Sequence, residues 1–392
     1  MSDRKYKPGK HFLQLPGPSN VPDRILNAMC YPTIDHRGPE FSELALKCLS
    51  GIKTIFKTKN PVIIFPASGT GAWEAALVNT LNDGDNVLIV ETGHFASLWN
   101  NMAQKLGLNV ELLKTDWRQG LDPNEIEKRL RLDTDKKIKA ICIVHNETST
   151  GCIANVKAVR DILDDLNHDA LLMVDTISGL ASINYEHDEW GVDITISGSQ
   201  KGLMLPPGLS FNAISEKAIN ISKKSTLRKS YWDWVEYLEF NKTGFFPYTP
   251  ATNMLFGLNE AINMLHEEGL NNVFKRHARY SKATRIAVEA WGLEVFCQNE
   301  ERFSDVLTAV MVPENKDADQ LRKIILENFN MSLGNGLSKL KGKVFRIGHL
   351  GDFNDLSLLG TLSGVEMGLD LIQIPIRDAG VEKAREYLKE NL

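Results

Sequence analysis

Two stretches decide the fold of this chain: Leu171-Leu172-Met173-Val174-Asp175 and Asp193-Ile194-Thr195-Ile196-Ser197-Gly198-Ser199-Gln200-Lys201-Gly202. Each contains a short, largely apolar run and ends near a charged side chain, Asp175 in the first and Lys201 in the second. Apolar runs without regular polar alternation are typical of strands that are covered on both faces. Residues at the carboxyl ends of such strands lie where open α/β sheets bind their ligands.

Similar apolar runs recur before and after these two stretches, and helical patterns separate them. Their order predicts a mostly parallel, doubly wound α/β sheet. The predicted strands are 62–65, 86–90, 109–113, 138–144 and 209–214.

The pattern changes beyond about residue 275, where strands become fewer. Helices are expected over 276–290, 319–329 and 354–371, strands over 306–312 and 344–347, and a glycine-rich loop over 334–342. This predicts a smaller C-terminal α+β domain. The expected division is an N-terminal arm (1–19), a large domain (20–275) and a small domain (276–392).

The composition indicates a cytoplasmic protein. Of 392 residues, 43% are hydrophobic and 24% are charged, and the net charge of −5 argues against nucleic-acid or anionic membrane partners. Five cysteines without a C-x-x-C pair argue against a disulfide framework and against zinc, so a reducing compartment and no metal are expected. The polar N-terminus has no signal-peptide pattern, and no apolar run is long enough for a membrane span.

Lys201 and Asp175 are the first candidates for chemistry. Burial would lower the pKa of Lys201 and make its amine nucleophilic enough to form an imine, although most lysines lie on the surface. Asp175 could cap a helix, bind a metal, or keep the pyridine nitrogen of pyridoxal phosphate (PLP) protonated. No cluster of metal-ligand residues surrounds Asp175, which counts against the metal.

Three further segments carry polar groups next to predicted strands. Ser68-Gly69-Thr70-Gly71 could cradle a phosphate at a helix start or form a structural turn, but it is neither a dinucleotide fingerprint nor a P-loop. His145–Gly151 indicates a site or a capped turn. Arg346, inside the apolar run 344–347, could clamp a substrate carboxylate or form a structural salt bridge.

Taken together and in order, these segments resemble the class V aminotransferases of PLP fold type I. The resemblance is greatest to serine–glyoxylate and alanine–glyoxylate aminotransferases, and it covers nearly the whole chain. Besides the segments above, it is carried by Phe12–Pro22, Pro32–Pro39, Phe246–Pro250 and Phe345–Gly348. It implies a large domain with a mostly parallel seven-stranded sheet and a smaller C-terminal domain.

The resemblance also implies roles for individual residues. Lys201 should carry PLP as a Schiff base and shuttle a proton, and Asp175 should pair with the pyridine nitrogen. The other implied cofactor contacts are Thr70, Gly71, Ala72 and Gln200 around the phosphate, Phe95 on the ring face and Thr148 at the ring edge. Arg346 should hold the substrate carboxylate, with Thr148 beside it. Thr249 should reach the neighbouring subunit's cofactor, which would make a homodimer with composite active sites obligatory.

Two positions depart from the alanine–glyoxylate pattern. Ala72 stands where some of those enzymes have His, and Phe95 where they have Trp. The expected reaction is a ping-pong transamination from L-serine to glyoxylate, with alanine and aspartate open as donors. A lyase of the cysteine desulfurase type, with Cys297 as its thiol, is a remote alternative because Cys297 lacks basic surroundings. A nicotinamide-dependent dehydrogenase and a non-catalytic binding protein are less favoured still.

Overall fold

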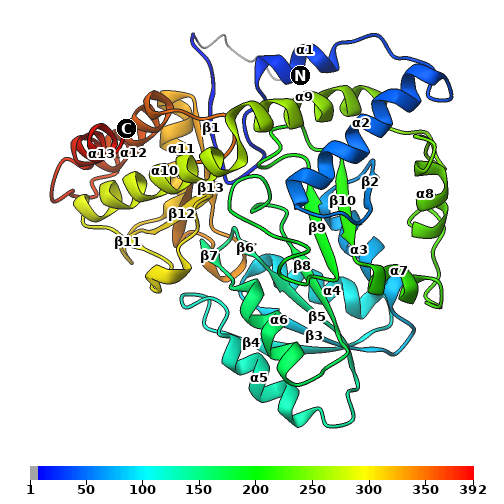
Figure 1. Ribbon diagram of the computed structural model, residues 1–392. Helices are drawn as coiled ribbons and strands as arrows, with labels where there is room; N and C mark the ends of the chain where they lie inside the picture. Colours follow the sequence, from blue (N-terminus) through cyan, green and yellow to red (C-terminus); the bar gives the residue numbers. More distant parts are fainter. Residues whose placement is uncertain (1–7) are drawn as a thin grey trace.

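The computed structural model describes residues 8–392, so the first seven residues of the predicted arm lie outside the described part (Figure 1). Its centre is a seven-stranded sheet in the order β2-β10-β9-β8-β5-β3-β4. Only β10 is antiparallel to its neighbours, which confirms the predicted mostly parallel α/β sheet. The strands are β2 (Val62–Phe65), β3 (Asn86–Glu91), β4 (Asn109–Lys114), β5 (Ile138–Val144), β8 (Leu171–Asp175), β9 (Ile194–Gly198) and β10 (Ser210–Ile214).

Helices cover both faces of this sheet, which agrees with the largely apolar composition of its central strands. Along β8 the side chains alternate between two cores: Leu172 and Val174 belong to one, and Leu171 and Met173 to the other. The first core includes α2 (Pro39–Phe56), α5 (Pro123–Leu132), α6 (Val156–Asp165) and α9 (Thr252–Glu268). The second includes α3 (Gly69–Thr80), α4 (His94–Lys105), α7 (Glu216–Ser222) and α8 (Trp234–Asn241).

The C-terminal part has a five-stranded sheet in the order β1-β13-β14-β12-β11 and a separate hydrophobic core (Figure 1). The strands are β1 (Phe12–Gln14), β11 (Glu294–Val295), β12 (Leu307–Met311), β13 (Met331–Asn335) and β14 (Val344–Gly348). Its helices are α10 (Leu270–Ala290), α11 (Ala318–Phe329), α12 (Asp355–Leu371) and α13 (Gly380–Glu390). The remaining elements are α1 (Asp23–Met29), β6 (Asn146–Glu147), β7 (Cys152–Ile153) and two short 3₁₀ turns, Glu300–Arg302 and Ser338–Leu340.

The structure differs from the sequence-based expectation in three places. The predicted helix 276–290 begins at Leu270, so the proposed domain boundary near residue 275 falls within α10 and stays a prediction. Part of the predicted arm, β1, pairs in parallel with β13 and thus belongs to the C-terminal sheet. The expected loop 334–342 starts inside β13, because Gly334 and Asn335 pair with β14.

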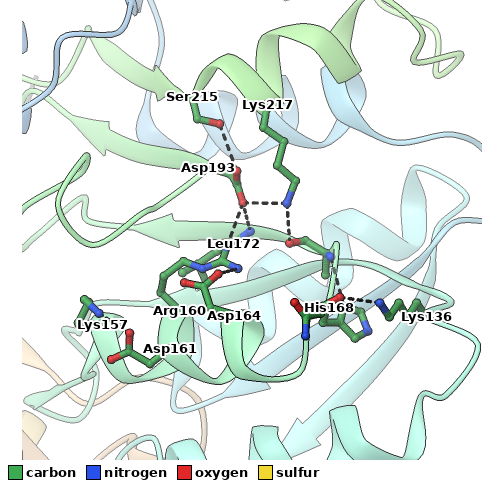
Figure 2. A network of polar contacts seen from close by, with 12 residues as sticks. Lys136, Lys157, Arg160, Asp161, Asp164, His168, Leu172, Asp193, Ser215 and Lys217 are labelled. Atoms are coloured by element: carbon green, nitrogen blue, oxygen red, sulfur yellow. Dashed lines mark hydrogen bonds and ion pairs between the residues drawn. The ribbon is translucent and has the colours of Figure 1, made fainter.

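A polar network holds together the ends of β8 and β9 that are opposite to Asp175 and Lys201 (Figure 2). Buried Asp193 accepts hydrogen bonds from the Leu172 backbone N–H at 2.9 Å and from Ser215 Oγ at 3.2 Å. Arg160 and Lys217 place cationic nitrogens 3.7 and 3.6 Å from the same carboxylate. These contacts join α6, β8, β9 and the start of α7 and stabilise this end of the sheet. Asp175 and Lys201 lie at the opposite end.

No helix among residues 8–392 combines the length and the apolar character needed to cross a membrane.

Candidate active site

A pocket of about 250 Å³ lies at the carboxyl ends of β8 and β9, next to the start of α3. It brings together six of the predicted site residues: Thr70, Phe95, Thr148, Asp175, Gln200 and Lys201. The other lining residues are Gly17, Pro18, Ser68, Gly69, Trp73, Val144, Asn146, Ile177, Ser178 and Pro207. The position agrees with the rule that open α/β sheets bind ligands beyond the carboxyl ends of their strands.

Asp175 is the last residue of β8 and only 4% of its surface is exposed. Its two carboxylate oxygens accept hydrogen bonds from Trp73 Nε1 at 2.9 Å and from the Ile177 backbone N–H at 2.7 Å. Burial raises the pKa of Asp175 to about 7, although the Ile177 N–H opposes this shift. Each oxygen retains a lone pair, so the carboxylate can still accept a hydrogen bond from a ligand.

Lys201 follows β9, and its Nζ donates a hydrogen bond to the backbone carbonyl of Pro16. Burial lowers the pKa of Lys201 to about 7, and the positive charge of Arg346 acts in the same direction. A substantial fraction of neutral amine is therefore present near neutral pH, and the neutral form is the nucleophile. Lys201 thus lines the pocket and is not an ordinary surface lysine.

The start of α3 borders the pocket at the place where the anion cradle is predicted. The N–H groups of Gly71 and Ala72 donate to Ser68 O at 2.9 and 3.4 Å, so those of Gly69 and Thr70 are the ones that lack a partner inside the helix. Gly69 packs against Ile177 so closely that a Cβ would lie 2.3 Å from Ile177 Cδ1. Gln200 Oε1 is buried without a hydrogen-bond partner among the described residues, so this oxygen could accept a hydrogen bond from a donor in the pocket.

Four predicted residues are not part of the pocket lining. Ala72 is fully buried in the core, and the backbone N–H of Gly71 donates to Ser68 O at 2.9 Å within the first turn. Thr249 lines a different hollow of about 610 Å³, next to His36 and Tyr248. The fourth residue is Arg346.

Arg346 is buried in β14 and hydrogen-bonds backbone carbonyls. Its Nη1 donates to Thr148 O at 2.6 Å and its Nε to Asn335 O at 2.7 Å. Across residues 8–392 its guanidinium forms no ion pair with a carboxylate, which disfavours the structural salt bridge. Burial lowers the pKa of Arg346 to about 10, and Glu147 opposes this shift. The remaining N–H groups could bind a carboxylate.

The sequence reasoning missed several lining residues. Trp73 lies in α3, stacks on Trp99 with ring centroids 5.7 Å apart, and orients Asp175 through its indole N–H. Asn146 Nδ2 donates to Ser178 Oγ, while Asn146 Oδ1 is buried without a partner among the described residues. Asn146 lies within the polar segment 145–151, which was the available signal. Trp73 carried no such signal.

Cys297 is buried and does not line the pocket. Its thiol donates to the backbone oxygen of Asn299 at 3.4 Å. A desulfurase thiol has to reach the substrate, so this position gives that alternative no support.

The sheet topology, with a lysine and an aspartate in one pocket, is that of PLP fold type I proteins. The class V aminotransferase family model matches residues 12–338, and this chain belongs to that family. It is therefore a member of a family of PLP-dependent transaminases.

Similar proteins of known name include several glyoxylate aminotransferases. The chain is 45% identical to a serine–glyoxylate aminotransferase of Arabidopsis thaliana, with 100% of this chain and 98% of the relative aligned. It is 40% identical to an L-aspartate–glyoxylate aminotransferase of Paracoccus denitrificans, over 96% of both chains. Among solved structures, the ureidoglycine–glyoxylate aminotransferase of Bacillus subtilis superposes with a TM-score of 0.90 at 26% identity, covering 98% of this chain and 100% of the other.

Proposed function

We propose that this protein binds PLP in the pocket at Lys201 and transfers an amino group from L-serine to glyoxylate, which gives hydroxypyruvate and glycine. The observation that carries the proposal is a partly buried amine, Lys201, in one pocket with a buried carboxylate, Asp175. The resemblance to serine–glyoxylate aminotransferases supports this choice of substrates. The relative that uses L-aspartate keeps aspartate as the second candidate donor, and alanine remains a third.

The residues of the pocket fit PLP. The start of α3 offers N–H donors for a phosphate, and Thr70 and Gln200 lie beside it. Asp175 offers a carboxylate for a pyridine nitrogen, and Phe95 offers a flat apolar surface for a ring. When bound, PLP supplies an electron sink for the negative charge that develops at the substrate Cα.

The protein's own groups would then have separate tasks. The Asp175 carboxylate would hold a proton on the pyridine nitrogen. The neutral Lys201 amine would hold the cofactor covalently and would take and return a proton at the substrate Cα. Arg346 and Thr148 would orient the substrate, with the free N–H groups of Arg346 on its carboxylate. Gly71 and Ala72 donate their N–H groups to Ser68 O, so they would shape the first turn of α3 behind the phosphate instead of contacting it.

We further propose a homodimer in which Thr249 completes the phosphate site of the other subunit. In a single chain Thr249 lies in a separate hollow, away from Lys201. That hollow is lined by aromatic side chains and by His36 and Arg37, which suits a contact surface. A cytoplasmic location is also proposed, because all five cysteines are free thiols.

The test is a spectroscopic screen of substrates. Purified protein with PLP is mixed with single L-amino acids, and loss of the visible absorption of the lysine-bound cofactor is followed. L-Serine should remove this absorption, and glyoxylate should then restore it better than pyruvate or oxaloacetate does. Loss of the absorption with L-aspartate but not with L-serine would favour the second candidate. A protein that binds no PLP would contradict the proposal altogether.

A further inference from the structure

Glu147 is a buried acidic residue with no role in the steps above. It lies in β6 and only 1% of its surface is exposed. Its Oε2 accepts hydrogen bonds from the backbone N–H groups of Phe95 at 3.1 Å and Ala96 at 3.4 Å. Its Oε1 accepts from the backbone N–H of Ser149 at 3.0 Å and from Ser149 Oγ at 2.6 Å. Four donors converge on the two oxygens; burial raises the pKa of Glu147, and these hydrogen bonds oppose that shift because an ionised carboxylate can only accept.

Ser149 extends these contacts by one residue. Its Oγ accepts a hydrogen bond from the backbone N–H of His94 at 2.9 Å. Glu147 and Ser149 together therefore bind three successive N–H groups at the start of α4, which lack partners inside the helix. We call these two residues the α4 clamp. A carboxylate in this position also interacts favourably with the helix dipole.

The local backbone is built for this contact. The residue before α4 is Gly93, which has no side chain to cap the helix. A Cβ on Gly93 would lie 2.3 Å from Glu147 Cγ and 2.4 Å from Cδ, so only glycine leaves room for the carboxylate. The cap of α4 thus comes from a distant segment of the chain instead of from the residue next to the helix.

The clamp acts on a residue that lines the pocket. Phe95 is the second residue of α4, and its N–H is one of the three that the clamp binds. We propose that Glu147 is a positioning residue that fixes the first turn of α4, so that the Phe95 ring forms a rigid wall against the flat ring of bound PLP. This inference rests on the proposed function.

The first test measures cofactor binding instead of turnover. In Glu147→Gln one oxygen is replaced by an NH₂ group, which faces backbone donors and cannot accept from them. The dissociation constant for PLP should rise at least about tenfold, and the visible circular dichroism of bound PLP should weaken. Glu91→Gln is the matched control, because the Glu91 side chain accepts from Ser97 Oγ of α4 and from none of the backbone N–H groups at the start of that helix. It should leave both readouts unchanged.

The second test asks whether Glu147 acts through Phe95. In a double-mutant cycle with Phe95→Leu, the effect of Glu147→Gln on PLP affinity should largely vanish once the ring is gone. Ser149→Ala removes one clamp hydroxyl while keeping the carboxylate, so it should give a smaller loss in the same direction. If Glu147→Gln fails to fold, the PLP affinity of Ser149→Ala tests the same inference.

The outcomes separate cleanly. Additive effects in the cycle, or a lower melting temperature with unchanged PLP affinity, would show that the clamp only stabilises the fold and would overturn the inference. If the wild-type protein and the Glu147→Gln variant bind PLP equally well, only the proposed role of Glu147 is contradicted. Wild-type protein that binds no PLP contradicts the proposed function instead.

Discussion

Lys201 and Asp175 share one buried pocket, and burial shifts their pKa values in opposite directions, both to about 7. Lys201→Ala should abolish the visible absorption of bound PLP and lower turnover by at least about a thousandfold, because no other amine replaces the nucleophile. Absorption spectra and steady-state rates check this. Lys224→Ala, which changes an exposed lysine, should behave as wild type. A Lys201→Ala variant with near wild-type turnover would refute the assignment.

Asp175→Asn tests the carboxylate separately. The amide oxygen can still accept from the Ile177 N–H, but the NH₂ group would face the Trp73 Nε1–H and lose that hydrogen bond, so PLP should stay bound with a modest loss of affinity. The neutral amide cannot hold a proton on the pyridine nitrogen, and the half-reaction with the amino donor should slow at least about a hundredfold. Stopped-flow absorption measures this rate beside the PLP dissociation constant. The same half-reaction rate in both proteins would exclude the proposed role of Asp175.

The lowered pKa of Lys201 predicts a pH dependence of stability for the protein without PLP. As the pH falls from about 10 to about 7, the unfolded chain takes up a proton on Lys201 and the folded chain does not. The free energy of unfolding should therefore fall over this range, by at most about 1.4 kcal/mol per pH unit. Urea unfolding at several pH values measures it, and Lys201→Met should remove this contribution. Equal slopes for the two proteins would speak against a buried, neutral Lys201.

At the scale of elements, the segment after β1 forms the wall behind Lys201. Gly17 has a φ of +114°, and a Cβ on it would lie 2.2 Å from Lys201 Nζ. Gly17→Ala should therefore displace the lysine and weaken PLP binding, in addition to straining the backbone. Gly9→Ala is a matched control, because Gly9 also has a positive φ of +85° but has nothing within 4 Å of an added Cβ.

The readouts for this pair are PLP affinity and melting temperature. Both variants carry backbone strain, but only Gly17→Ala should lose PLP affinity, by about tenfold or more. If the two variants lost affinity equally, backbone strain and not the contact with Lys201 would be the cause.

At the scale of the whole molecule, the proposed dimer predicts complementation between two inactive proteins. When Lys201→Ala and Thr249→Ala subunits exchange, each mixed dimer should contain one site with both lesions and one site with neither. Activity should then exceed that of either parent. Mass spectrometry or labelled subunits would show that exchange has occurred. No recovery after proven exchange would mean that Thr249 serves its own subunit or none.

Secondary structure could be predicted best from the sequence where a local apolar pattern reflects burial. The apolar runs at 62–65, 138–144 and 171–174 correspond to strands of the large sheet, because covered strands need apolar side chains on both faces. The pairing of β1 with β13 was not predicted, since hydrogen bonds between segments more than 300 residues apart leave no periodic signal in either segment. The start of α10 was misplaced although Leu270, Val273 and Phe274 recur at helical spacing, because Gly269 alone separates this helix from α9.

By itself, the sequence determined the α/β class and the placing of Lys201 and Asp175 just beyond buried strands. Both follow from patterns that a few neighbouring residues carry. Only the tertiary structure decided what surrounds them: Trp73 on Asp175, Pro16 on Lys201, and the separation of Thr249 from the pocket. The Trp73–Asp175 and Pro16–Lys201 hydrogen bonds join segments that are far apart in the chain, and only the packing of the folded chain brings these segments together.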